Sequence, residues 1–224
     1  MPGFLFVPGF VNVPIFATGM STFSTKITSL VFPGLTWELP SGNNELFLTF
    51  DDGPHPVITP KVLNILDAYE AKATFFCVGE NVQKHPETYA HIIERGHRTG
   101  NHTFNHMKGW GTEKTEYLDN IRKCRELVDS DLFRPPHGRI TKKQAEILLA
   151  SAYKIVMWSV LTKDYQQNSN REKLLQNAIR KTEPGSIIVF HDSEKAAENM
   201  LFLLPRFLEY FSGKGYVFKV IDHL

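Results

Sequence analysis

Short strand-like runs alternate with longer helix-like stretches from residue 46 to the C-terminus, and this alternation limits the possible folds most strongly. The short runs are rich in β-branched and aromatic residues, whereas the longer stretches carry apolar residues at helical spacing. Strands that alternate with helices usually pair in parallel, because a parallel pair needs a long crossover connection. The pattern therefore predicts an α/β domain with one mainly parallel sheet covered by helices.

The predicted elements are numerous enough to close, or nearly close, a barrel. The expected strands are residues 46–50, 74–78, 97–101, 132–134, 154–158, 186–190 and 216–221. The expected helices are residues 59–70, 86–95, 114–129, 142–151, 171–181 and 197–211. This number of strands predicts a distorted (β/α) barrel, seven-stranded and TIM-like. A doubly wound open sheet is the alternative, but no glycine-rich phosphate loop follows any predicted strand, which disfavours nucleotide binding.

The charge and cysteine content disfavour several classes of protein. Lys and Arg total 25 and Asp and Glu total 24, and the basic residues are not gathered in a stripe. We therefore expect no nucleic-acid partner. Two cysteines disfavour a disulfide framework, and Cys77 lies in the apolar run 73–78, which is predicted to be a buried strand.

Residues 1–25 contain no charged side chain, yet they lack the features of a membrane span. Prolines and glycines recur through them, so we expect no clear membrane-spanning segment. A positively charged n-region is also missing, so no clear signal peptide is identified. An extension or mis-assigned start and a role in export or anchoring both stay open. We divide the chain into an N-terminal extension and lead-in, residues 1–45, and one domain, residues 46–224.

Polar residues with catalytic potential follow most of the predicted strands. They stand at the carboxyl end of a strand or a few residues beyond it: Asp51, Asp52, His102, His106, Arg134, Asp164 and His191. In a β/α barrel these ends meet in one mouth, where active sites lie. This convergence is the main reason to expect an enzyme, because no single motif is specific enough alone.

The aspartate pair and the histidine pair together predict a metal centre. Asp51 and Asp52 point in different directions off a strand end, so that one can bind a cation while the other acts as a base. His102 and His106 are four residues apart, a spacing that places both rings on one face of a helical turn. Two imidazoles and one carboxylate leave coordination positions open, which is the pattern of hydrolytic zinc. We therefore expect a divalent metal, first Zn²⁺, with Co²⁺, Ni²⁺ or Fe²⁺ as alternatives.

Three further residues have the chemistry to support such a centre. Arg134 precedes two prolines that fix an extended exit, and its guanidinium can hold a carboxylate bidentately. His191 ends an apolar run and can act as a general acid near neutral pH. Asp164 would raise the pKa of a nearby histidine by stabilising its cation.

Taken in order, these motifs resemble the polysaccharide deacetylases of the NodB-homology type, carbohydrate esterase family 4. The resemblance covers about residue 46 to the C-terminus. It rests on Thr-Phe-Asp-Asp-Gly at 49–53, His-Thr-Phe-Asn-His at 102–106, Arg-Pro-Pro at 134–136, Trp158 with Asp164, and Val-Phe-His-Asp at 189–192. It implies a distorted, often seven-stranded β/α barrel. It also implies a metal-dependent hydrolase that removes N-acetyl groups from N-acetylglucosamine-containing polysaccharide of the chitooligosaccharide or peptidoglycan type. The partner is then a carbohydrate, and use in the cell envelope or outside the cytoplasm is implied.

The resemblance also implies a role for each residue. The metal ligands are Asp52, His102 and His106. The catalytic residues are Asp51 as the base, Arg134 orienting that base, His191 as the acid and Asp164 supporting the acid. The substrate-binding residues are Trp158 and Val189, which line the acetyl pocket, and His137, whose backbone N–H helps to bind the oxyanion.

Several departures from the family pattern leave the substrate less defined than the chemistry. His137 stands where an aromatic residue is usual, Tyr165 replaces a tryptophan, and Leu161 occupies an earlier acidic position. Val189 replaces a commoner leucine. Two alternatives stay open: an O-acetyl esterase acting on xylan-like polymers, and a catalytically silent sugar-binding protein on the same fold. The complete set of catalytic residues disfavours the silent protein.

Overall fold

Strands and helices alternate along the chain as the sequence predicts in the computed structural model, which describes residues 34–40 and 44–222. The strands are β1 (Leu35–Thr36), β2 (Glu45–Asp51), β3 (Ala73–Cys77), β4 (Arg98–Asn101), β5 (Leu132–Phe133), β6 (Lys154–Val156), β7 (Val160–Leu161), β8 (Ile187–His191) and β9 (Val217–Phe218). The helices are α2 (Ile58–Ala68), α3 (Gly79–Lys84), α4 (Pro86–Glu94), α5 (Lys114–Arg125), α6 (Lys142–Ala150), α7 (Arg171–Lys181) and α8 (Ala197–Ser212), with a 3-10 turn η1 (Pro136–Gly138). The uncharged stretch 1–25 lies outside the described residues.

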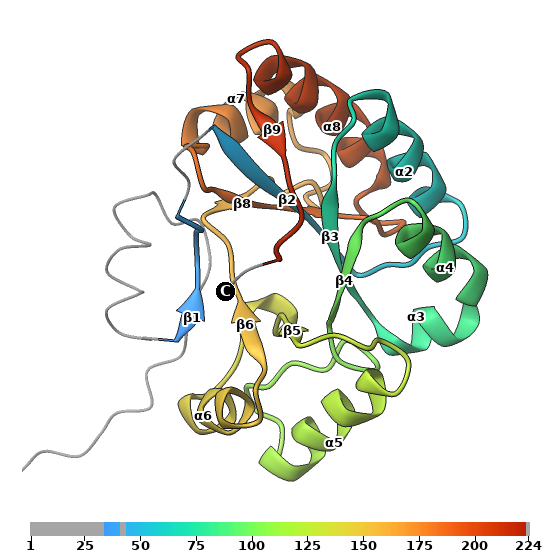
Figure 1. The fold of residues 1–224 in the computed structure, drawn as a ribbon, viewed down its shortest axis with the longest axis vertical. Helices are drawn as coiled ribbons and strands as arrows, with labels where there is room; N and C mark the ends of the chain where they lie inside the picture. The colour runs from blue at the N-terminus through green and yellow to red at the C-terminus, as the bar shows by residue number, and fades with distance from the viewer. Residues whose placement is uncertain (1–33, 41–43, 223–224) are drawn as a thin grey trace, which may run out of the picture.

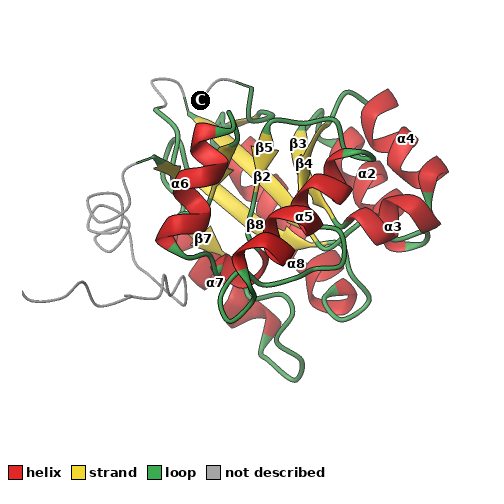
Figure 2. Ribbon diagram, turned by 90° about the horizontal axis from the view of Figure 1, so that it is seen from below, coloured by secondary structure: helices red, strands yellow, loops and turns green. Residues whose placement is uncertain are grey.

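The named strands form one curled, parallel sheet. Their order is β1-β6-β5-β4-β3-β2-β8-β7, and β9 pairs in parallel with β2 beside this path. Helices lie along the outer side of the curl (Figure 1), and the strands are seen between them in the perpendicular view (Figure 2). The predicted distorted (β/α) barrel is therefore confirmed.

Every predicted strand is present, but the sequence did not reveal three short elements. β1 and β7 have two residues each, too few to show an alternating pattern, and they lie at the two ends of the strand order. α3 was missed because its six residues, Gly-Glu-Asn-Val-Gln-Lys, contain only one apolar side chain. A single apolar residue cannot show helical spacing. The barrel thus has more strands than the seven predicted.

Alternate residues of β2 face opposite sides of the sheet, and this alternation positions the site. Leu48 and Phe50 are fully buried in the core cluster that faces the helices. Thr49 and Asp51 therefore face the interior of the barrel, and both contact Arg134 there. Because Asp51 is the last residue of β2, its carboxylate lies at the mouth of the barrel.

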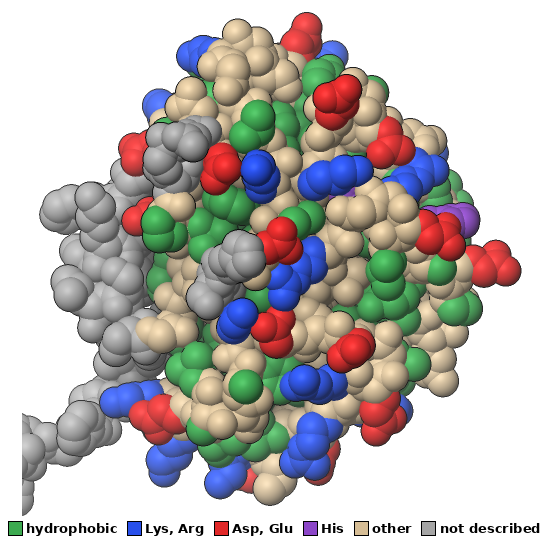
Figure 3. All heavy atoms as spheres, in the orientation of Figure 1, with side chains coloured by type: hydrophobic (Ala, Val, Ile, Leu, Met, Phe, Trp, Pro, Cys, Tyr) green, Lys and Arg blue, Asp and Glu red, His purple; other side chains and the backbone are tan. Residues whose placement is uncertain are grey.

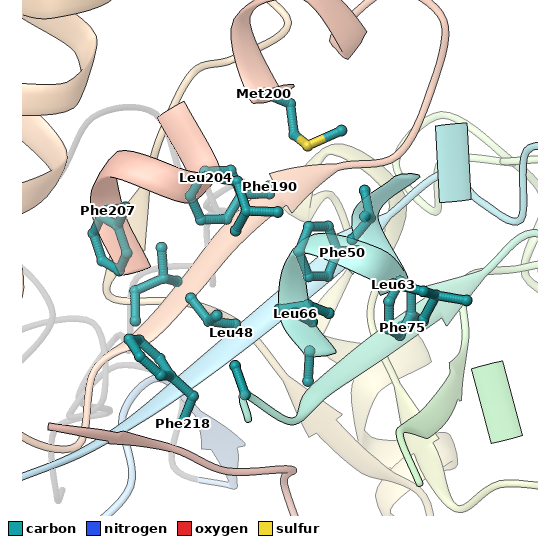
Figure 4. Packing of buried hydrophobic residues seen from close by; sticks show 14 of the residues in the cluster. Leu48, Phe50, Leu63, Leu66, Phe75, Phe190, Met200, Leu204, Phe207 and Phe218 are labelled. Atoms are coloured by element: carbon teal, nitrogen blue, oxygen red, sulfur yellow. The ribbon is translucent and has the colours of Figure 1, made fainter. Parts of the chain in front are cut away.

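The core between the sheet and helices α2 and α8 holds the central strands in register. Figure 4 shows Leu66 of α2 and Leu204 of α8 packed close to Phe50, Phe75 and Phe190. The Phe50 ring is stacked on Phe75 at 4.9 Å and on Phe190 at 5.8 Å between ring centroids. Packing of this density resists displacement, so the ends of β2, β3 and β8 are fixed relative to one another.

Part of the lead-in belongs to the same structure. β1 pairs with β6, and Trp37 is buried in a second core cluster with residues of α5 and α6. The predicted domain boundary at residue 45 stays a prediction.

Cys77 and Cys124 are both buried and unpaired. Among the described residues, no helix combines the length and apolar character needed to cross a membrane.

Charged side chains of both signs are interspersed on the face drawn in Figure 3. This distribution accords with the balanced totals of 25 basic and 24 acidic residues. The absence of a nucleic-acid partner rests on this balance and stays a prediction.

Candidate active site

A cavity of about 480 Å³ opens at the carboxyl ends of the central strands. The predicted site residues that line it are Asp51, Asp52, His102, His106, His137, Trp158, Val189 and His191. The other two predicted site residues, Arg134 and Asp164, are fully buried and hydrogen-bond to the lining. All the predicted site residues thus meet at one place.

Asp52, His102 and His106 form a cluster that can hold a metal ion. Each offers one ligand atom, and these atoms lie within 4.8 Å of one another. Oδ1 of Asp52 is 3.2 Å from Nε2 of His106 and 3.8 Å from Nε2 of His102. Nδ1 of His102 lies 2.8 Å from the carbonyl oxygen of Arg134, so its N–H can donate there and leave Nε2 for an ion.

The electrostatics of the cluster favour the protonation states that a metal needs. Burial lowers the pKa of His102 to about 4 despite the nearby charge of Asp51, so the ring is neutral at pH 7. Burial acts to raise the pKa of Asp52, but its hydrogen bond with His106 and the charges of neighbouring histidines outweigh this effect. The pKa of Asp52 therefore lies well below its ordinary value, and the side chain is a carboxylate.

His102 and His106, the predicted metal-ligating histidines, are not on a helical turn, and this part of the prediction was wrong. Residues 102–106 form a loop in which Thr103 and His106 have φ values of 64° and 59°. The side chain of Asn101 accepts a hydrogen bond from the Thr103 amide, and the Thr103 hydroxyl accepts one from the Met107 amide. These bonds stabilise left-handed backbone that non-glycine residues seldom adopt, and the rings converge by this route.

Arg134 holds Asp51 from inside the barrel. Its Nη1 donates to Oδ1 of Asp51 at 2.7 Å and to the Thr49 hydroxyl at 2.7 Å. Its other nitrogens donate to the carbonyls of Val156 and Met157. The contact with the carboxylate is therefore a single hydrogen bond and not the bidentate pair that the sequence suggested, because the neighbouring backbone takes the remaining donors.

His191 is the last residue of β8 and is bound to Asp164. Nδ1 of the ring lies 2.7 Å from Oδ1 of Asp164, and the His191 amide donates to Oδ2 at 2.8 Å. Burial lowers the pKa of His191, but the charge and hydrogen bond of Asp164, with smaller contributions from Asp52 and Asp51, raise it to about 9. The ring is therefore protonated at neutral pH, as a general acid must be.

The predicted substrate-binding residues surround this chemistry. Trp158 and Val189 line the cavity together with Leu161, which gives it an apolar part. His137 has a φ of 58°, and its ring lies 4.7 Å from that of His106 between centroids. Burial and the charge of His106 lower the pKa of His137, so this ring is neutral at pH 7.

Sequence reasoning missed several residues that contribute to the site. Arg139 and Lys195 line the cavity but belong to no recognised motif. Asp192 is fully buried, accepts a hydrogen bond from the Thr59 hydroxyl, and has a pKa raised to about 7 by burial. It ends the Val-Phe-His-Asp motif at 189–192, but that place does not separate a positioning carboxylate from a strand-end residue.

Comparison with known proteins agrees with this geometry. The sequence pattern of the polysaccharide deacetylases matches residues 39–156, more than half of the chain. The chain belongs to the polysaccharide deacetylase family. The chain is 32% identical over 197 residues to a peptidoglycan-N-acetylglucosamine deacetylase of Bacillus cereus, covering 85% of this chain and 92% of the relative. It is 32% identical over 166 residues to a chitooligosaccharide deacetylase of Azorhizobium caulinodans, covering 71% and 79%.

A solved relative shares the fold. The crystal structure of the Bc1960 peptidoglycan N-acetylglucosamine deacetylase superimposes with a TM-score of 0.81 at 30% identity. The match covers 86% of this chain and 94% of the relative. The named activities of these relatives support a hydrolase that acts on a carbohydrate amide.

Proposed function

We propose that this protein is a metal-dependent hydrolase that removes N-acetyl groups from N-acetylglucosamine-containing polysaccharide of the peptidoglycan or chitooligosaccharide type. One observation carries the proposal: a His/His/Asp cluster, an arginine-held carboxylate and a carboxylate-held histidine face one cavity. The named activities of the relatives from Bacillus cereus and Azorhizobium caulinodans support the N-acetyl substrate.

The donor set fits a divalent ion such as Zn²⁺. Asp52, His102 and His106 would hold it with one carboxylate oxygen and two imidazole nitrogens. Three protein ligands leave coordination positions for water and substrate, as in hydrolytic zinc sites. When bound, such an ion supplies Lewis-acid chemistry, which polarises a carbonyl oxygen and lowers the pKa of water. Co²⁺, Ni²⁺ and Fe²⁺ are the alternatives to Zn²⁺.

Asp51 acts as the base in this proposal. It accepts a proton from the water molecule whose oxygen attacks the acetyl carbonyl carbon. Arg134 donates to Oδ1 of Asp51, so Oδ2 is the oxygen assigned to the proton transfer. The fixed orientation of the carboxylate reduces the entropy lost on reaching the transition state.

His191 acts as the acid. Asp164 is bound to Nδ1, which leaves the Nε2–H to face the substrate nitrogen. As the carbon–nitrogen bond breaks, His191 donates that proton to the departing amine, and the products are acetate and a free amino sugar. The same imidazole then regains a proton from solvent, and Asp51 releases to solvent the proton that it accepted.

The remaining residues bind the acetyl group. Trp158 and Val189 are proposed to contact the acetyl methyl in the apolar part of the cavity. The backbone N–H of His137 is proposed to donate to the carbonyl oxygen as negative charge develops on it. A histidine at this position keeps the N–H that an aromatic residue would provide.

An acetate-release assay over chitooligosaccharides, peptidoglycan and acetylxylan tests the proposal. We expect faster release from the N-acetylglucosamine polymers than from acetylxylan, and loss of release in Asp51→Asn, which keeps the size of the side chain. A preference for acetylxylan would favour an O-acetyl esterase. No acetate from any of the three, with metal supplied, would favour a silent sugar-binding protein.

A further inference from the structure

The loop that joins the two proposed metal-ligating histidines, His102 and His106, has an unusual backbone. Thr103 and His106 have φ values of 64° and 59°. Left-handed backbone at such residues persists only where the surrounding structure imposes it. The hydrogen bonds described above hold the two ends of the loop, and the amides of Phe104 and Asn105 lie between them. The middle of the loop therefore needs partners from elsewhere in the fold.

Asn120 of α5 supplies these partners. Its Oδ1 accepts a hydrogen bond from the Phe104 amide at 2.7 Å and a longer one from the Asn105 amide at 3.4 Å. Its Nδ2 donates to the side-chain oxygen of Asn105 at 2.9 Å. The half-buried side chain thus binds the middle of the loop at three points. Because its oxygen accepts while its nitrogen donates, the orientation of the Asn120 amide is fixed.

A second helix, α3, binds the same loop. The Gly79 amide donates to the Thr103 carbonyl at 3.0 Å, and the Glu80 amide donates to the Phe104 carbonyl at 2.7 Å. A Cβ atom on Gly79 would lie 2.7 Å from Cδ2 of Phe104, so the backbone of α3 packs directly against the loop. Figure 2 shows α3 and α5 side by side. The loop is therefore held by both helices, and Asn120 supplies its hydrogen bonds to α5.

The shape of this loop decides where the second imidazole lies. Because residues 103–105 connect the two histidines, their backbone sets the separation of the two rings. His102 is also oriented by the carbonyl oxygen of Arg134, 2.8 Å from its Nδ1. The side chain of His106 is 34% exposed, so its position depends more on the loop backbone. Groups that orient metal ligands from outside the ligand set typically affect metal affinity by about 10- to 100-fold.

We propose that Asn120 is a positioning residue for the metal centre, because it fixes the backbone between His102 and His106 and thereby the distance between the two imidazoles. The inference rests on the proposed function, which takes these histidines and Asp52 as ligands of a divalent ion. Asn120 lies outside the lining of the cavity. It therefore acts on the affinity and the coordination geometry of the ion and takes no part in a chemical step.

Titration of the full chain with Zn²⁺ and with Co²⁺ tests this role. Competition with a chelating dye measures the Zn²⁺ affinity, and the visible absorption of Co²⁺ reports the geometry around the ion. Asn120→Ala removes all three hydrogen bonds, so it should weaken Zn²⁺ binding about tenfold and alter the Co²⁺ spectrum. Asn120→Asp keeps the acceptor for both loop amides and should give the Co²⁺ spectrum of the wild type.

Two further variants are the controls. Asn177→Ala removes another half-buried helix asparagine, which accepts a hydrogen bond from Arg180 in α7, and it should change neither the affinity nor the spectrum. Arg122→Gln changes the net charge by the same single unit as Asn120→Asp but adds no acceptor to the loop. It therefore shows how much of any change in Zn²⁺ affinity comes from charge alone.

Unchanged Zn²⁺ affinity and an unchanged Co²⁺ spectrum in Asn120→Ala would overturn the inference. A lower melting temperature of the metal-free variant without a change in either would also overturn it, because Asn120 would then support only the fold. If Asn120→Ala does not fold, Asn105→Ala decides, since it removes only the acceptor for Nδ2 of Asn120. Zn²⁺ binding weakened a few-fold in Asn105→Ala would support the role, and unchanged binding would refute it.

The wild type separates this inference from the proposed function. If the wild type binds neither ion, the metal centre and the role of Asn120 are both refuted. If it binds Zn²⁺ but releases no acetate from any of the three polymers, only the proposed function fails. The Zn²⁺ affinities of the wild type and Asn120→Ala then still decide whether Asn120 positions the metal centre.

Discussion

Asp164 contacts His191 at two points, through Oδ1 to the ring at 2.7 Å and through Oδ2 to the backbone amide at 2.8 Å. One buried carboxylate thus fixes both the end of β8 and the orientation of the imidazole. Burial alone would lower the pKa of His191, but the nearby negative charges raise it to about 9. The proton proposed for the leaving amine is therefore retained over the whole neutral range.

The pH dependence of kcat/KM should reveal this pairing. His191 must be protonated, so activity should fall as pH rises through its pKa, near 9 in the wild type. In Asp164→Asn the main stabiliser of the cation is lost, and the basic limb should move to lower pH by about one unit or more. The rate at pH 8 should then fall more than the rate at pH 6. An unmoved basic limb in profiles measured at fixed metal would remove Asp164 from the site.

Metal binding should depend on His102 and His106 and should stabilise the fold. Elemental analysis of protein purified without chelator should find about one ion per chain, and His102→Ala or His106→Ala should lose most of it. Zn²⁺ at a hundred times its Kd should stabilise the wild type by about 2.7 kcal/mol, and neither variant should respond. Thermal unfolding with and without chelator measures this stabilisation.

His91→Ala, which removes a helix histidine outside the cluster, is the control. Wild-type protein that neither holds metal nor gains activity with Zn²⁺ or Co²⁺ would refute the metal centre.

The fold and the placement of the site could be predicted because they depend on local periodicity. The apolar run 46–50 predicted the strand and placed Asp51 at its end, and parallel pairing brought the strand ends to one mouth. His102 and His106 were correctly placed together, but for the wrong local reason. Their loop depends on left-handed residues and on hydrogen bonds from Asn101 and Thr103, which no helical or strand period encodes.

Contacts between distant segments could not be read from the sequence. Arg139 gives no periodic signal, and its place beside Trp110 follows from the packing of η1 and α6 against one loop. The single contact from Arg134 to Asp51 depends on which backbone carbonyls lie within reach of the guanidinium. Such details arise from three-dimensional packing, so they required the structure.

Substitutions of the two adjacent aspartates, Asp51 and Asp52, should differ in their effect on metal content. Asp51→Asn removes the proposed base but leaves the His/His/Asp cluster, so metal content should stay near the wild-type level while turnover is lost. Asp52→Ala removes one of three ligands, so metal and turnover should both fall. Metal analysis and kcat on the same preparations measure the difference. Equal metal content in the two variants would contradict the assigned roles.

Gly53 should be intolerant of any side chain, because the carboxylate of Asp192 occupies the space beside it. A Cβ atom on Gly53 would lie 2.1 Å from Oδ2 and 2.4 Å from Oδ1 of Asp192. Asp192 has little room to yield, since Oδ2 accepts a hydrogen bond from the Thr59 hydroxyl and its amide donates to the Asp51 carbonyl. We expect Gly53→Ala to destabilise the fold by about 1–3 kcal/mol, as overpacking does, and to lower kcat/KM by displacing Asp51.

A double-mutant cycle identifies the cause. If the clash with Asp192 is responsible, Gly53→Ala should cost less in an Asp192→Ala background than in the wild type, because the shorter side chain vacates the space. Urea unfolding of the wild type, the two single variants and the double variant gives the interaction free energy. Equal costs in both backgrounds would show that Gly53 is required for a different reason. In that case steric contact with Asp192 would not be the reason for a glycine at position 53.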